Sequence, residues 1–252
     1  MIYIKNKQAI AKMRIAGQRL SQIVEGMREY VVAGVTTGEL DALIETRMRA
    51  AELRPMCKGY GTYQHATCIS INDVVVHGIP SNRTLVDGDI VTIDVVGSYK
   101  GYCVDMARCF AVGTISDTAQ RLIDTAQRAL DAAIKKIAPK IPLREVCRVI
   151  QTVVEKEKFG ILRDFVGHGI GKAMHEEPQV PNFVSSDVTA LLQQGMTLAI
   201  EPMITEHGHE VQVMEDGWTV RTIDGGLSAH IEDTIVVTAH GAEVLTRPNE
   251  RV

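Results

Sequence analysis

The sequence has 252 residues, of which 45% are hydrophobic and 23% are charged, as is typical of a globular protein with a well-filled core. The formal net charge of −4 gives no sign of a surface built to bind nucleic acid specifically. No apolar run approaches the roughly 18 residues of a membrane span, and the N-terminus has no signal-peptide stretch, so we expect a cytoplasmic protein without a membrane partner. Five cysteines without any C-x-x-C pair indicate reduced thiols.

The first part of the chain is predicted to be helical. Apolar residues recur at helical spacing from Ile10 to Met27. A second helix is predicted after Thr36, because Thr36 and Glu39 have the spacing of a capping box, in which each side chain bonds the other residue's backbone N–H.

The rest of the chain alternates between predicted strands and helices. Residues 67–113 contain short apolar runs separated by glycine-rich turns, which predict antiparallel strands. Two further helices are predicted at 116–136 and 143–159, and strands return from 167 to 245. The order helices, strands, helices, strands predicts an α+β fold with two similar halves in one domain, residues 1–252.

Two predicted strands of one hairpin each carry an aspartate where a core residue is expected. With the turn at Tyr99-Lys100, Asp94 and Asp105 would lie directly opposite each other, where like charges destabilise a sheet. Their neighbours are apolar, and two buried, facing carboxylates can share a proton or bind a cation. The alternative is an edge hairpin with one aspartate in water and the other capping a turn. We favour a metal or catalytic site.

Further polar residues interrupt later apolar runs. Glu201 lies in MTLAIEPMIT and Glu232 lies in SAHIEDTIVVT. One such glutamate is more often an edge residue than a ligand, but four carboxylates in apolar strands are harder to explain that way. His168 lies between two glycines in GHGIGKAMHEEP, where the missing side chains could let the imidazole approach an ion.

Three other motifs that could indicate a function are incomplete or lie in an unsuitable context. The G-x-G-x-G-K pattern would need to open a helix to bind phosphate, and Pro178 and Pro181 argue against one. The sequence HEEPQ from His175 lacks the second histidine of a zinc helix, and no G-x-S-x-G motif is complete. His207 and His209, in EHGHE, are predicted to lie in an exposed turn.

The chain resembles the pita-bread metallopeptidases, and most closely their type I methionine aminopeptidases, in five residues and their contexts: Asp94, Asp105, His168, Glu201 and Glu232. The resemblance covers nearly the whole chain and includes SINDVVVHGIP, DGDIVTIDV, GHGIG, MHEEPQVPN, IEPM and DGWTV. It implies two pseudo-symmetric halves around a central dimetal site. It also implies removal of N-terminal methionine from peptides and nascent chains when the second residue is small.

The resemblance implies a role for each of the five ligands. Asp94 would bind one divalent ion, Asp105 and Glu232 would bridge two ions, and His168 and Glu201 would complete the other site. One imidazole among four carboxylates is a hard donor set, and the ions could be Co, Mn, Fe, Zn or Mg. A water shared by the two ions would attack the scissile carbonyl, with Glu201 as the proton shuttle.

The resemblance also implies residues that bind substrate. His175 would stabilise the developing oxyanion, and His77 would contact the substrate backbone near the scissile nitrogen. The pocket for the methionine side chain would draw on soft and aromatic residues: Cys57, Tyr60, Tyr63, Cys68, Met174 and Trp218. The ribosome is a further expected contact, and the protein is expected to be a monomer.

Three positions depart from the family pattern. Gly61-Thr62 replaces the usual His-Gly, and Met174 stands where an aromatic residue is common. His230 stands where glutamine is usual and should share a strand face with Glu232, since alternate residues of a strand point the same way. A neutral imidazole could take over much of the hydrogen bonding of the amide.

Two other functions remain open at the level of the sequence. An Xaa-Pro peptidase of the prolidase or aminopeptidase P type would resemble this chain in its ligands, but such proteins usually carry an additional N-terminal domain. Here the first ligand is residue 94, which leaves room only for the opening helices. A non-catalytic pita-bread protein that binds protein or nucleic acid would typically have lost ligands, and none of the five is missing.

Overall fold

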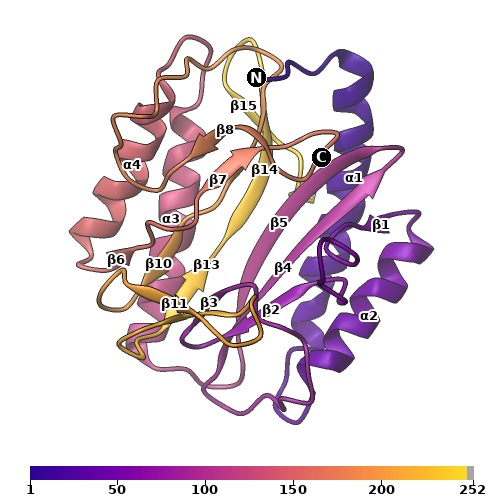
Figure 1. The fold of residues 1–252 in the computed structure, drawn as a ribbon, viewed down its shortest axis with the longest axis vertical. Coiled ribbons are helices and arrows are strands. Elements are labelled where there is room, and N and C mark those ends of the chain that lie inside the picture. The colour runs from indigo at the N-terminus through magenta and orange to yellow at the C-terminus, as the bar shows by residue number, and fades with distance from the viewer. Residues whose placement is uncertain (249–252) are drawn as a thin grey trace.

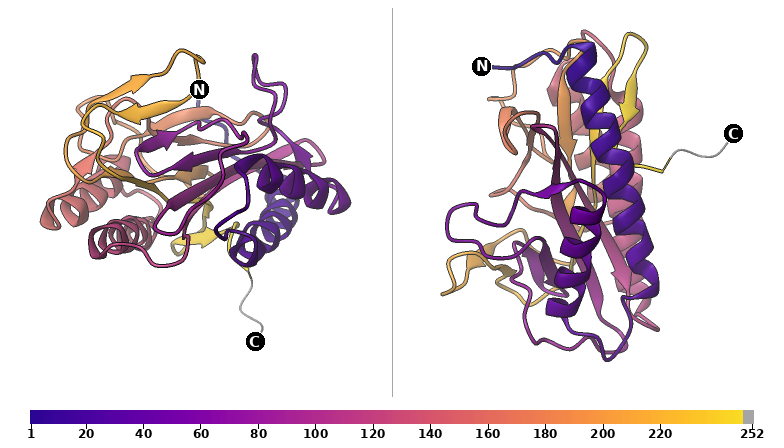
Figure 2. Two further views of the ribbon diagram at one scale, coloured as in Figure 1. Left: turned by 90° about the horizontal axis from the view of Figure 1, so that it is seen from below. Right: turned by 90° about the vertical axis from the view of Figure 1, so that its right-hand side faces the viewer.

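The structure is a computed structural model that describes residues 1–248. Its four α-helices all lie on one side of the main sheet (Figure 1, Figure 2), and their bounds are α1 (Lys7–Glu25), α2 (Thr37–Ala50), α3 (Asp117–Lys136) and α4 (Leu143–Lys156). The capping box that was predicted at Thr36 is present with both of its hydrogen bonds. A short 3-10 helix, η1 (Gly26–Glu29), follows α1. Within the described residues, none of the helices is both long and apolar enough to span a bilayer.

The main sheet has nine strands and runs in the order β1-β4-β5-β14-β9-β7-β8, with β2 beside β4 and β15 beside β14. Its strands are β1 (Arg54–Pro55), β2 (Cys68–Ile71), β4 (Ile90–Tyr99), β5 (Tyr102–Ala111), β7 (Gly167–Gly169), β8 (Glu176–Val180), β9 (Thr197–Ile200), β14 (Glu232–Val237) and β15 (Ala242–Val244).

Two three-stranded sheets accompany the main sheet. One contains β13 (Ser228–His230), β10 (Met203–Thr205) and β6 (Gly160–Ile161), and the other contains β11 (Val211–Val213), β12 (Val220–Thr222) and β3 (Val74–Val76). The pairings between the named strands are antiparallel.

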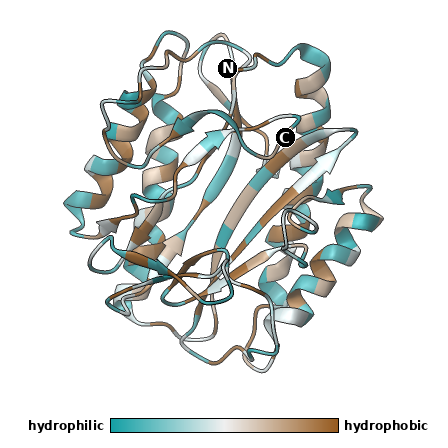
Figure 3. Cartoon of the chain, in the orientation of Figure 1, coloured by the Kyte–Doolittle hydropathy of each residue, from teal (hydrophilic) through white to brown (hydrophobic). Residues whose placement is uncertain are grey.

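Each half of the molecule has its own helix pair and apolar core. Residues of α1 and α2, such as Met13 and Ile44, pack with residues of β4 and β5. Residues of α3 and α4, such as Leu130 and Ile150, pack with residues of β9 and β14. The two halves join where β5 pairs with β14. The strands in the middle of the molecule contain both apolar and hydrophilic residues (Figure 3). The predicted α+β fold is confirmed.

The β4–β5 hairpin turns one residue later than the sequence predicted. Tyr99 pairs with Tyr102, and the turn residues Lys100 and Gly101 have φ of 48° and 81°. Two positive φ angles match the twist of a two-residue hairpin turn, and glycine supplies the second without steric cost. Asp94 therefore opposes Ala107, and Asp105 opposes Val96. The prediction of directly opposed aspartates was wrong; the two lie diagonally, on one face of the sheet.

The hairpin is also not an edge, because β4 has β2 on its other side and β5 pairs with β14. The sequence predicted that Glu201 lies inside a strand. It instead lies directly after the last residue of β9. The next residue is Pro202, which has no N–H to continue the ladder. The chain passes there from the main sheet into a small one, and at Ile231, between His230 and Glu232, it passes back from that small sheet into the main sheet.

Candidate metal centre and active site

A cavity of about 480 Å³ opens over the middle of the main sheet. The structure brings seven of the predicted site residues to its wall: His77, Asp94, Asp105, His168, His175, Glu201 and Glu232. They come from both halves of the chain, with the first three from residues before α3 and the other four from residues after α4. The cavity thus collects acidic and imidazole groups that are far apart in sequence.

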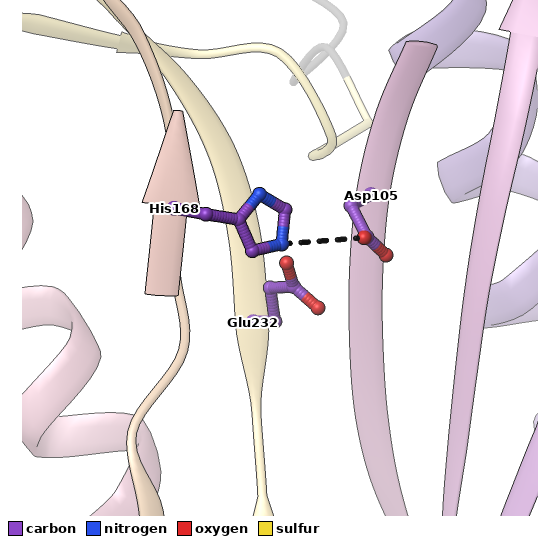
Figure 4. Close-up of side chains that lie close together, drawn as sticks. All are labelled: Asp105, His168 and Glu232. Carbon is purple, nitrogen blue, oxygen red and sulfur yellow. Dashed lines mark ion pairs between the residues drawn. The ribbon is translucent and has the colours of Figure 1, made fainter. Parts of the chain in front are cut away.

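Three of these side chains converge from three different strands (Figure 4). His168 on β7 points at Asp105 on β5, with Nε2 3.8 Å from Oδ2, and Glu232 on β14 lies below the two. His168 Nε2 is also 3.5 Å from Oε1 of Glu201. Asp105 is 4% exposed and Glu232 is 2% exposed, so these carboxylates have little access to solvent. Asp105, His168 and Glu232 offer ligand atoms close enough together to hold one metal ion.

A backbone hydrogen bond orients the imidazole of His168. Its Nδ1 lies 2.9 Å from the carbonyl oxygen of Gly169, which can only accept, so Nδ1 carries the proton. This leaves the lone pair of Nε2 directed at the carboxylates, as a metal-binding histidine requires.

The glycines beside His168 allow close contact between neighbouring strands. A Cβ on Gly167 would lie 2.5 Å from the carbonyl oxygen of Ala199, and one on Gly169 would lie 2.2 Å from that of Glu177. The glycines therefore admit the neighbouring backbone on both sides of β7, a role that the sequence did not predict; that they also let the imidazole approach an ion stays a prediction. No helix follows this segment within the described residues, so a phosphate loop is excluded.

The acidic cluster is unfavourable without a cation. Burial raises the pKa of Asp94, and it raises the pKa of Asp105 and of Glu232 well above the usual range, with neighbouring carboxylates adding to the effect. Oδ1 of Asp105 and Oε1 of Glu232 are buried and have no hydrogen-bond partner among residues 1–248. Buried acceptors without partners, together with imidazole nitrogen, are the donors that divalent ions take, so the residues present fit a metal centre.

His77 and His175, which also line the cavity, are held neutral. Burial lowers the pKa of His77, and burial together with the neighbouring His168 lowers the pKa of His175 to about 4. The ring of His175 packs edge-on against His168, with centroids 4.5 Å apart, and His77 packs against Phe165 at 5.3 Å. At neutral pH each ring can therefore donate one hydrogen bond without bringing a positive charge into the cavity.

Residues 11–239 match the model of metallopeptidase family M24. The chain belongs to this family. The M24 peptidase is 43% identical to the methionine aminopeptidase of Escherichia coli strain K12 over 247 residues, 97% of this chain and 94% of the relative. It is 37% identical to methionine aminopeptidase 1 of Bacillus subtilis strain 168, over 98% of this chain and 100% of the relative.

Solved structures agree with these relationships. The crystal structure of methionine aminopeptidase from Thermotoga maritima has a TM-score of 0.96 and 41% identity, covering 98% of this chain and 100% of that chain. Prolidase from Pyrococcus furiosus has a TM-score of 0.80 at 23% identity, over 98% of this chain and 66% of the prolidase, which shows the shared fold alone. The M24 peptidase is therefore a metal-dependent hydrolase with the pita-bread fold. The alternative of a non-catalytic binding protein is not supported.

The six residues predicted to bind the methionine side chain do not line the cavity. Cys57, Tyr63, Cys68 and Met174 are buried in the core of the first half, and Trp218 packs against Tyr63 with ring centroids 5.1 Å apart. Tyr60 is 49% exposed and lies edge-on to His175, with centroids 5.8 Å apart. Cys68 opposes Asp94 in the β2–β4 ladder, so this group of side chains borders the cavity without forming its wall.

Apolar residues of the cavity wall were missed. Val76, Phe165 and Met203 line it together with the polar groups. Each lies within three positions in the sequence of a predicted site residue: His77, His168 or Glu201. Closeness in sequence to those residues is the signal that could have identified them as part of the cavity wall. His207 and His209 are exposed beside Gly208, as predicted.

Proposed function

We propose that this M24 peptidase removes methionine from the N-terminus of peptides and nascent chains when the second residue is small. One observation carries the proposal. A chain that aligns over 97% of its length with a methionine aminopeptidase gathers Asp94, Asp105, His168, Glu201 and Glu232 around one cavity.

These five residues would hold two divalent ions of the kinds Co, Mn, Fe, Zn or Mg. Asp94 would bind one ion, Asp105 and Glu232 would bridge both, and His168 and Glu201 would complete the second site. The ions, when bound, would supply an acidified water as the nucleophile.

The protein's own groups would do the rest of the chemistry. Glu201 would take the proton of the attacking water and pass it to the leaving amine. His175, kept neutral, would donate a hydrogen bond to the carbonyl oxygen as negative charge develops there. His77 would contact the substrate near the scissile nitrogen. Cys57, Tyr60, Tyr63, Cys68, Met174 and Trp218 remain the proposed surroundings of the methionine side chain.

The proposal extends to the setting of the reaction. All five proposed ligands come from one chain, which supports the proposal that the protein acts as a monomer. Newly made proteins present their N-terminal methionine at the ribosome, which places the expected activity in the cytoplasm. We infer one domain for residues 1–252, because the β5–β14 ladder joins the two halves in a single sheet; residues 249–252 lie outside the described part.

A panel of three dipeptide-type substrates tests the function. We expect Met-Ala to be cleaved with a kcat/KM about 100-fold or more above that of Met-Leu, because a bulky second residue would meet the cavity wall beyond the metal site. Ala-Pro should be the poorest substrate. A preference for Ala-Pro would instead identify the Xaa-Pro peptidase.

Metal binding is expected to release protons and to strengthen as the pH rises. The raised pKa of Asp105 and of Glu232 means that the ion-free site retains protons that a cation must displace. For the same reason the ion-free protein should lose stability as the pH rises from about 4, the usual carboxyl pKa, through the raised values. Calorimetric titration with Mn²⁺ in two buffers of different ionisation enthalpy measures the release. Identical heats in both buffers would contradict it.

A further inference from the structure

A second imidazole, that of His230, also reaches the acidic cluster. His230, the last residue of β13, is 2% exposed, and its Nε2 lies 3.4 Å from Oε2 of Glu201 and 3.8 Å from Oε2 of Glu232. The pairing of His230 with Met203 in the β10–β13 ladder holds its backbone in place. Glu201, His230 and Glu232 form a second group whose ligand atoms all lie within 4.8 Å of one another.

The ring of His230 has no partner of its own. Neither Nδ1 nor Nε2 makes a hydrogen bond with any residue of 1–248, although both are buried. This differs from His168, whose Nδ1 is bonded to the carbonyl of Gly169. A fully buried imidazole with two unpaired nitrogens is costly, so a group from outside the chain is expected to complete its bonding. The neighbouring Oε1 of Glu232 is unpaired in the same way.

We propose that His230 is a sixth ligand of the metal centre and that its Nε2 binds an ion together with Glu201 and Glu232. The inference rests on the metal centre of the proposed function and adds a donor to it. The centre then has two imidazoles, that of His168 on β7 and that of His230 on β13. The resemblance had implied a single imidazole among four carboxylates.

The extra nitrogen changes which ions the centre favours. Imidazole suits Fe²⁺, Co²⁺, Ni²⁺ and Zn²⁺, whereas an all-oxygen environment suits Mn²⁺ and Mg²⁺. His230 therefore acts as a specificity-determining residue for the ion. Glutamine at this position would offer an amide oxygen in its place, so His230→Gln converts the added donor from nitrogen to oxygen with a similar reach.

The first experiment counts imidazoles on the metal. In the proton NMR spectrum of the Co²⁺-loaded protein, each coordinated imidazole gives one strongly shifted, exchangeable ring N–H resonance. We expect two such resonances for the wild type and one for His230→Gln. A single resonance in the wild type would overturn the inference, and this result does not depend on whether the variant folds.

The second experiment compares ion affinities by calorimetry. The ratio of Co²⁺ affinity to Mn²⁺ affinity should fall by about tenfold or more in His230→Gln. It should stay unchanged in His240→Gln, which removes an exposed histidine outside the cavity. An unchanged ratio in His230→Gln would refute the sixth ligand while leaving the metal centre intact. A wild type that binds neither ion would refute the metal centre itself, so the two failures are distinguishable.

Discussion

Replacing Asp105 by asparagine is expected to lower both the affinity for divalent ions and kcat/KM by about 100-fold or more. The substitution keeps the shape of the side chain but removes its charge and one of its two acceptor oxygens. Oδ1 of Asp105 is buried without a partner, and Oδ2 faces His168 in Figure 4, so both oxygens belong to the acidic cluster. Metal analysis after dialysis, together with the rate on Met-Ala, measures the two losses.

His175→Ala is the matched comparison. His175 lines the same cavity, but its ring packs against His168 and lies outside both candidate groups of metal-binding residues. Its removal should slow turnover and leave the ion content largely unchanged. Equal loss of ions in the two variants would show that the proposed division between metal ligands and substrate-binding groups is wrong.

Replacing Asp233 by alanine is expected to lower the free energy of unfolding by about 3 to 5 kcal/mol. Asp233 is fully buried and accepts hydrogen bonds from Arg108 at 2.8 Å, Arg247 at 2.6 Å and Thr246 at 2.9 Å. Arg108 also donates to Glu25 at the end of α1 and to the carbonyl of Glu232. Without Asp233, the buried guanidinium of Arg108 would lose its charge partner on β14.

Urea unfolding followed by circular dichroism measures this loss. Asp187→Ala is the control, because Asp187 is exposed and its removal should change the stability by no more than about 0.5 kcal/mol. If Asp233→Ala unfolds at the wild-type urea concentration, the Arg108 network contributes little to stability. Urea is preferred to guanidinium chloride, since the salt would screen the ion pairs under study.

The helices could be predicted from the sequence because their signals are local. The capping box at Thr36 and the apolar spacing of α1 act within one or two turns of chain, so no distant contact is needed to recognise them. The face shared by Asp94 and Asp105 could also be predicted, even though the turn was misplaced. Moving the turn by one residue shifts the pairing by two, and a strand repeats its orientation every two residues.

The features that could not be predicted from local sequence depend on contacts between segments that are far apart in the chain. The backbone that excludes a side chain at Gly167 belongs to β9, more than thirty positions away. The wall formed by Phe165 and Met203 depends on a meeting between the loop before β7 and the start of β10, which lie far apart in the sequence. The proposed ligand set was predicted from the sequence through its resemblance to a family, since the five residues keep their order and contexts, and the structure brings all five to one cavity. Alternation along a strand predicted that His230 lies on the side of Glu232, but its approach to Glu201 depends on the pairing of β13 with β10, a contact between distant segments.

The division of the five proposed ligands between the two halves has a consequence for how the protein matures. Asp94 and Asp105 are translated early and His168 and Glu201 follow, but the centre lacks Glu232 until β14 has been made and paired with β5. A partly synthesised chain that ends before residue 232 has no complete site and would hold ions weakly. If the five residues are the ligands, stable loading with metal is expected only after Glu232 has been synthesised, and a chain that is still shorter than that is expected to be inactive as a peptidase.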